Sequence, residues 1–109
     1  MTKSPPYSEI GGCKWGESYD YGGFNVTWPL ASLRLGEGGL TISISSCGRD
    51  FSFSLKDVIS VRKVGGFLAW GIQIQHSKSD YPEFIAFWSW SRSRLLWELR
   101  NAGFPVEAP

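Results

Sequence analysis

The amino-acid sequence predicts a small, mainly β protein: an antiparallel barrel of about seven strands, capped by one C-terminal α-helix. Three observations lead to this fold class. Between residues 24 and 90, apolar residues recur at every second position, as in strands with one buried face. Glycine-rich or polar segments separate these short runs, as in antiparallel hairpins. After residue 90 the apolar spacing changes to that of an amphipathic helix.

The alternating runs define the expected strands. In LTISIS, three apolar residues alternate with Thr and Ser, which indicates one buried and one solvated face. In FSFSL, Phe51, Phe53 and Leu55 are expected to point inward, and Pro29 is expected to mark a strand edge, bulge or start. In order, the runs are FNVTW (24–28), LASLRL (30–35), LTISIS (40–45), FSFSL (51–55), DVISVRKV (57–64), AWGIQIQH (69–76) and EFIAFWSW (83–90).

The helix is expected in SRSRLLWELRNAGFP, with Leu95, Leu96 and Leu99 on its buried stripe. Ser91 is the expected N-cap, and Gly103 stands where a helix-terminating glycine belongs. Pro105 prevents the helix from continuing.

The domain organisation follows from composition. Residues 1–23 mix Pro, Gly, Ser and charged residues without periodicity, so we expect an N-terminal arm that is either mobile or docked. Its aromatic residues, Trp15, Tyr19 and Tyr21, favour docking on the body or on a partner. Residues 24–105 are the expected barrel domain, and residues 106–109 the expected C-terminal tail.

A series of β-hairpins followed by one amphipathic helix resembles the pleckstrin-homology-like (PH-like) barrel, in which the helix plugs one open end. The resemblance covers roughly residues 28–104 and is closest to small uncharacterised bacterial PH-like proteins. The segments that carry it are LRLGEGGLTIS, DVISVRKV, GIQIQHSKSDYPEFIAFWS and LLWELRNAGF. The resemblance implies a barrel plugged by the leucine face of the helix.

Many PH domains bind phosphoinositides through basic residues around the first hairpin, which here reads LRLGEGGLTISIS. This hairpin offers Arg34 but no lysine and carries the acidic Glu37, so the lipid-binding residues of the family cannot be carried over and we expect no phosphoinositide binding there. An alternative headgroup-binding set would be Arg34, Lys56, Arg62 and Lys63, although the alternation along a strand separates Arg62 from Lys63.

Charge and cysteine content exclude several classes of function. Eleven basic and ten acidic residues give a net charge of +1, which argues against a nucleic-acid-binding surface. Cys13, Cys47 and one histidine are too few ligands for a structural zinc site, so we expect no metal and no cofactor. The sequence shows neither an apolar run of membrane-spanning length nor a signal-peptide pattern, so we expect a cytoplasmic protein with free thiols.

Residue types for catalysis are present but poorly arranged. His76 could act with Ser77, Asp80 and Asp57, but the sequence lacks a nucleophile elbow. A lone histidine at a strand end is more typical of a rim residue, so we expect no enzyme activity and keep a His76 hydrolase as a third alternative. Asp80 and Glu83 are expected to be solvated turn residues, and the glycines of GEGG and VGGF to be turn glycines, because strands follow both clusters.

The tryptophans near the C-terminus are the most suggestive candidates. EFIAFWSW is apolar on both faces, so we expect it to be covered on both, by the barrel interior and by the helix or arm. Alternatively, Trp88 and Trp90 are exposed together with Trp97, which lies opposite the leucine stripe. We therefore expect a non-catalytic binding or scaffolding module that engages a protein, a peptide or a second copy of itself through these aromatics or a barrel edge. A peripheral membrane adaptor is the alternative.

Overall fold

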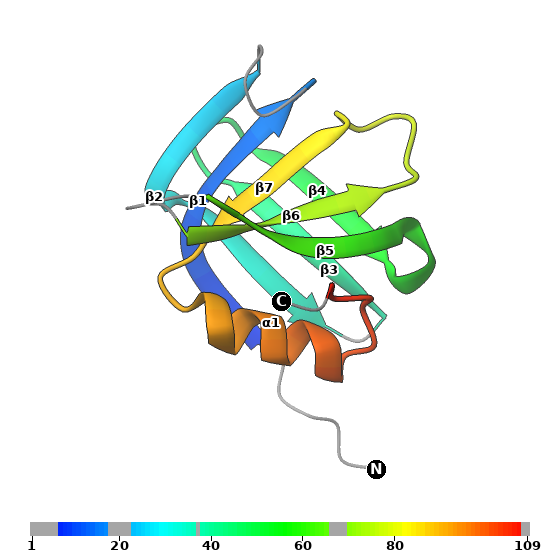
Figure 1. The fold of residues 1–109 in the computed structure, drawn as a ribbon. Coiled ribbons are helices and arrows are strands. Elements are labelled where there is room, and N and C mark those ends of the chain that lie inside the picture. The colour runs from blue at the N-terminus through cyan, green and yellow to red at the C-terminus, as the bar shows by residue number, and fades with distance from the viewer. Residues whose placement is uncertain (1–6, 18–22, 37, 66–69, 108–109) are drawn as a thin grey trace.

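The computed structural model describes residues 7–17, 23–36, 38–65 and 70–107. Within them, seven strands form one antiparallel sheet in the order β4-β3-β2-β1-β7-β6-β5, and one α-helix follows (Figure 1). This confirms the predicted mainly β class with a C-terminal helix. The elements are β1 (Tyr7–Gly16), β2 (Phe24–Gly36), β3 (Gly39–Ile44), β4 (Arg49–Ser54), the 3-10 turn η1 (Leu55–Asp57), β5 (Val58–Gly65), β6 (Trp70–His76), β7 (Phe84–Trp88) and α1 (Arg92–Asn101).

The strand β1 corrects the expected domain boundary. It lies in the segment that we expected to be an arm, yet it occupies the middle of the sheet, between β2 and β7. Cys13 is completely buried, and Gly11 and Gly12 are buried beside it. The two glycines removed the alternating pattern from the sequence, because a strand position without a side chain gives no periodicity signal.

The count of seven strands is right, but their identities differ from those expected. The two runs on either side of Pro29 form one long strand, β2, which takes the place of two expected strands. Its pairing with β1 shifts at this point: Gly11 is opposite Ala31, whereas Cys13 is opposite Val26. The residues between these partners bulge out of the register, so Pro29 marks a bulge, one of the roles predicted for it.

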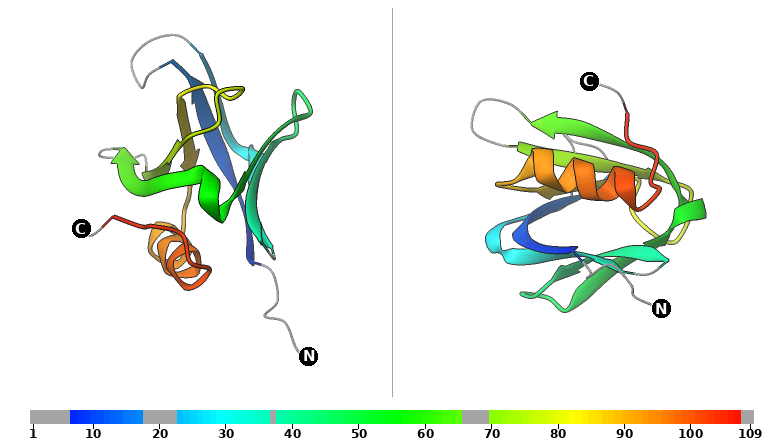
Figure 2. Two further views of the ribbon diagram at one scale, coloured as in Figure 1. Left: turned by 90° about the vertical axis from the view of Figure 1, so that its right-hand side faces the viewer. Right: turned by 90° about the horizontal axis from the view of Figure 1, so that it is seen from below.

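The sheet curls into a half-barrel with its core on the inner side, and α1 lies across one end of it (Figure 2). Alternate residues of β3, of β4 and of the second half of β2 fill this core, so Leu33 and Leu35 on β2 pair directly with Ile42 and Leu40 on β3. The outer β3 residues Thr41 and Ser43 are more exposed, as the sequence pattern predicted.

The helix α1 covers the open end through its leucines. Leu95, Leu96 and Leu99 are all buried in the main core. Gly103 has a positive φ of 97°, and the Phe104 N–H donates to the Leu99 carbonyl at 3.0 Å. This hydrogen bond forms part of a Schellman motif that ends the helix and returns Phe104 to the core, as the sequence predicted.

The strand β4 ends one residue earlier than predicted. Leu55 was expected to point inward, but it belongs to η1 and is largely exposed. The Asp57 carboxylate accepts hydrogen bonds from the Ser54 N–H at 2.8 Å and from the Ser54 hydroxyl at 2.9 Å. These bonds favour a tight turn in place of a longer strand, and they hold the pKa of Asp57 below its usual value.

Both edges of the sheet are partly covered by the chain itself. At β4, the Ser52 N–H donates to the Tyr81 hydroxyl at 3.0 Å, and the Lys78 ammonium donates to the Ser52 carbonyl at 3.1 Å. At β5, Val61 bonds to the carbonyl of Pro105 and to the N–H of Glu107. The expected free tail at residue 106 therefore starts instead as an addition to β5, and neither edge is open at these positions.

We expect Leu99→Ala to lower the free energy of unfolding by about 2–5 kcal/mol, because it removes a completely buried side chain from the helix–barrel contact. Chemical denaturation measures this difference. Arg100→Ala, at the next and exposed position, is the control and should change stability by no more than about 0.5 kcal/mol. Equal stability of the two variants would contradict a helix that closes the core.

Candidate functional site

The first candidate site is a hollow of about 460 Å³ where α1 begins. Trp70 is 50% exposed and Trp90 is 70% exposed, so two indoles border it with much of their surface in water. We call it the tryptophan–arginine pocket, and it is lined by Trp70, Trp90, Ser91, Arg92, Ser93 and Arg94.

Three elements bring these side chains together. Trp70 is the first residue of β6, at the end of the sheet where a strand residue is no longer covered. The Ser89 N–H donates to the Trp70 carbonyl at 2.8 Å, which holds the segment after β7 beside the start of β6. The chain then turns through Trp90 into α1, so the first helical turn forms the remaining wall.

Among the residues that the structure describes, the pocket lining contains two cations and no carboxylate. The Arg92 guanidinium donates to the Val64 carbonyl at 3.2 Å, so its charge is fixed in place by a neutral group. Arg94 is instead paired with Glu98, with Nε and Oε2 2.8 Å apart. The first turn of α1 contains no acidic residue, and the Ser91 side chain makes no capping hydrogen bond. The N-terminus of the helix therefore adds its positive dipole to the charge of Arg92.

Trp97 extends the exposed aromatic surface along α1. It is 54% exposed, as its position opposite the leucine stripe predicted. Residues three and four apart on a helix are neighbours, so Trp97 lies one turn after Arg94 and Ser93, which line the pocket. Trp90 and Trp97 were predicted from the sequence as candidates for an exposed surface, but Trp70 was not. Alternation in AWGIQIQH puts Trp70 on the same face as Ile72 and Ile74, which indicates an inward position.

Trp88 is different from these three exposed tryptophans. Its indole lies across the sheet over glycines of the two neighbouring strands, Gly12 on β1 and Gly71 on β6. The indole N–H donates to the Asn25 side-chain oxygen at 3.0 Å. Trp88 is thus partly buried and has its polar atom satisfied, which makes it part of the sheet surface and a poor anchor for a partner.

The aromatic residues of the expected arm are not brought to this surface. Trp15 is only 5% exposed, stacks on Phe24 and meets Phe51 edge-on, so its prediction as a surface-binding residue is wrong. It sits in β1, where an inward position places it in the core. Tyr19 and Tyr21 lie outside the described residues.

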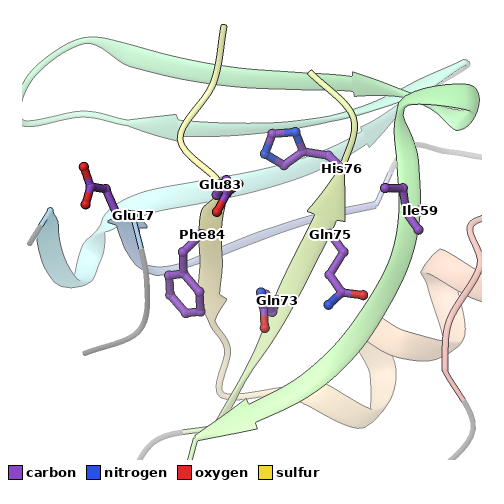
Figure 3. A pocket seen from close by; sticks show the side chains of 7 residues that line it. All are labelled: Glu17, Ile59, Gln73, Gln75, His76, Glu83 and Phe84. Carbon is purple, nitrogen blue, oxygen red and sulfur yellow. The ribbon is translucent and has the colours of Figure 1, made fainter. Parts of the chain in front are cut away.

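His76 borders a second hollow, of about 620 Å³, formed mainly by β6 and the residues before and at the start of β7 (Figure 3). Its ring is fully engaged: Nδ1 accepts from the Lys78 N–H at 3.0 Å, and Nε2 faces the Pro82 carbonyl at 2.8 Å. These partners select the tautomer that carries its proton on Nε2. The ring also packs against Phe53 and Tyr81. His76 therefore holds the β6–β7 loop on β4, a larger structural role than that of a solvated rim residue.

The other catalytic candidates are not assembled around His76. Ser77 donates to the backbone carbonyl of Asp57, while the Asp57 carboxylate binds Ser54. Asp80 and Glu83 are both exposed, and only Glu83 lines the hollow beside His76. Gly38 lies between β2 and β3, as expected of a turn glycine, and Gly65 is the last residue of β5, while Gly66 lies outside the described residues.

The basic residues of the lipid alternative also remain apart. Arg34 is on β2, separated from β5 by three intervening strands. On β5, Arg62 pairs with Gln73 and Lys63 with Ile72, so their side chains leave opposite faces of the sheet, as predicted. Lys56 lies in η1.

Both cysteines are free thiols, as expected: Cys13 is buried and Cys47 is exposed in the β3–β4 turn. Burial raises the pKa of the Cys13 thiol to about 12. Within the described ranges, no three His, Cys, Asp or Glu side chains form a group that could hold a metal ion. No helix in this part of the chain has the length and apolar character needed to cross a membrane.

Comparison of the chain with protein-family models, with curated proteins and with solved structures gave no match. Its own geometry is therefore the basis for any functional conclusion.

We expect His76→Ala to lower the free energy of unfolding by about 1–2 kcal/mol, because it removes two hydrogen bonds and the packing on Phe53. Thermal or chemical denaturation measures this loss. Asp80→Ala, in the same loop but exposed, should stay within about 0.5 kcal/mol of the wild type. A fully stable His76→Ala variant would contradict the structural role.

We expect Gly71→Ala to destabilise the protein by about 1–3 kcal/mol through overpacking. A Cβ at this position would lie 2.5 Å from the Trp88 ring and 2.7 Å from the Phe87 carbonyl. Gly36→Ala is the matched control, because no atom lies within 4 Å of its added Cβ. If both variants melt at the wild-type temperature, Trp88 does not depend on glycine neighbours.

Proposed function

We propose that this protein is a non-catalytic binding or scaffolding module with a PH-like barrel, and that its partner docks on the tryptophan–arginine pocket and the adjoining Trp97 side of α1. The strand order and the helix across the barrel end are compatible with a PH-like barrel. The resemblance to small bacterial members of that class is part of the same proposal.

The observation that carries the proposal is the gathering of three half-exposed or more exposed indoles, Trp70, Trp90 and Trp97, around one helix. Large aromatic side chains are the commonest anchors of protein interfaces, since each removes a large apolar area from water when a partner covers it. Exposed apolar groups clustered at one place favour a binding surface, whereas scattered ones are ordinary.

The structure favours docking of a partner on the aromatic surface over addition of a partner strand at an edge of the sheet. Ser52 on β4 and Val61 on β5 already bond to other parts of the chain, so a partner strand would have to displace these contacts. The aromatic surface needs no such displacement. A partner can therefore bind with little rearrangement of the barrel.

A selection from a displayed random-peptide library tests the proposal. We expect peptides enriched on the wild-type protein to lose their enrichment on the Trp70→Ser/Trp90→Ser variant, because the variant lacks the indoles that would anchor them. The control is Trp28→Ser, which removes an equally exposed tryptophan of the β2 bulge that does not line the pocket.

Because all these side chains are exposed, each variant should keep a melting temperature close to that of the wild type, and this is checked first. Light scattering of the full chain covers the case in which a second copy is the partner: the double variant should then be a monomer and the wild type should not. Peptides that bind all variants equally, together with a monomeric wild type, would refute the proposed surface.

A further inference from the structure

Resting on the proposed function, we infer that the tryptophan–arginine pocket receives an acidic linear segment of a partner protein. An apolar side chain of that segment packs on Trp70 and Trp90, and its carboxylates bind at Arg92 and at the first turn of α1.

The charge of the pocket favours an acidic ligand. Of its two arginines, Arg94 already has a carboxylate partner in Glu98, whereas Arg92, within the described residues, donates to the neutral Val64 carbonyl alone. The Arg92 side chain is half-buried, so its charge is less screened than that of an exposed arginine. The nearby Glu9 carboxylate accepts from the Tyr7 and Ser89 hydroxyls. Both hydroxyls are neutral, so Glu9 keeps its negative charge, but it is not among the residues that line the pocket. Within the described lining, Arg92 has no carboxylate partner, and an acidic ligand would supply one.

The N-terminus of α1 strengthens the same preference. The first N–H groups of a helix have no partner within the helix. Here the Ser91 N–H donates to the Ser89 hydroxyl at 2.9 Å, and the Ser91 side chain does not cap the N–H groups that follow. The wall of the pocket on this side is the first turn of α1, with Ser91, Arg92, Ser93 and Arg94. A carboxylate placed there would gain from both Arg92 and the helix dipole.

The indoles define the apolar part of the ligand. Trp70 and Trp90 come from two different elements, one from β6 and one from the turn before α1. The pocket volume of about 460 Å³ lies in the range of about 300–1,000 Å³ that is typical of ligand sites. It suits a few side chains of an extended segment.

A second copy of the chain and a membrane surface fit this charge less well. A two-fold interface would bring the pocket against itself and place Arg92 and Arg94 of both copies together. An anionic membrane attracts each surface cation by only about 1 kcal/mol, so stable attachment needs a cluster. Arg34 and Lys56 lie on other elements, and Arg62 and Lys63 leave opposite faces of β5.

The test is a titration with a short synthetic peptide that has glutamates on both sides of a central leucine, followed by NMR. We expect the indole N–H signals of Trp70 and Trp90 to shift and the Trp88 signal to stay. Arg92→Gln should weaken binding about tenfold or more. Arg100→Gln is the matched control: it removes the same charge from the same helix outside the pocket, and it should change the affinity by less than about twofold.

A counterpart with lysines in place of the glutamates should not bind, and binding of the acidic peptide should weaken as salt is added. The inference would be overturned if both peptides bound equally well, or if Arg92→Gln and Arg100→Gln weakened the binding of the acidic peptide equally. Library peptides that depend on Trp70 and Trp90 but are not acidic would overturn it while leaving the proposed function intact. If the protein binds phosphatidylserine vesicles through Arg92 and does not bind the acidic peptide, the ligand of the pocket is a membrane surface and the inference is wrong.

Discussion

The hydrogen bonding of β1 to two strands at once is the constraint on which the rest of the structure depends. β1 pairs with β2 on one side and with β7 on the other, and it thereby joins β2–β4 to β5–β7 in a single sheet. Its glycines make this possible. A Cβ on Gly11 would collide with Phe87 inside the barrel, and one on Gly12 would approach Trp88 outside it. The same two residues thus set the packing on both faces, and β7 in turn leads the chain to Trp90 and α1.

Much of the fold could be predicted because its signals are local. The leucine stripe, Gly103 and Pro105 predicted the helix and its end, and alternation predicted the inward faces of β3, β4 and β6. β1 could not be predicted in this way. Its identity depends on partners far along the chain, and the feature that suits it to the centre of the sheet, the absence of side chains at Gly11 and Gly12, is also what removes the pattern.

The candidate site was only partly predictable for a related reason. A helical wheel gives the direction of a side chain, so Trp97 could be recognised as exposed. Alternation gives the face of a strand residue but not how far along the covered part of the sheet it lies. Trp70 and Ile72 share a face, yet Trp70 is half exposed at the sheet end while Ile72 is completely buried. Arg92 gives no signal in the sequence, because its proposed role depends on its bond to the Val64 carbonyl and on its sharing one pocket with the two indoles.

Trp88 and Trp90 differ in how far the fold buries and hydrogen-bonds their indoles. Trp88 fits between glycines on both neighbouring strands and donates its N–H to Asn25, so the sheet accommodates that indole in detail. Trp90, two residues later, lies in a turn with 70% of its surface exposed. A turn before a helix is stable with a polar residue at such a position, and a solvated indole adds little to folding. The physical gain from Trp90 is therefore expected in a complex, where a partner removes its surface from water beside the positive charge of Arg92.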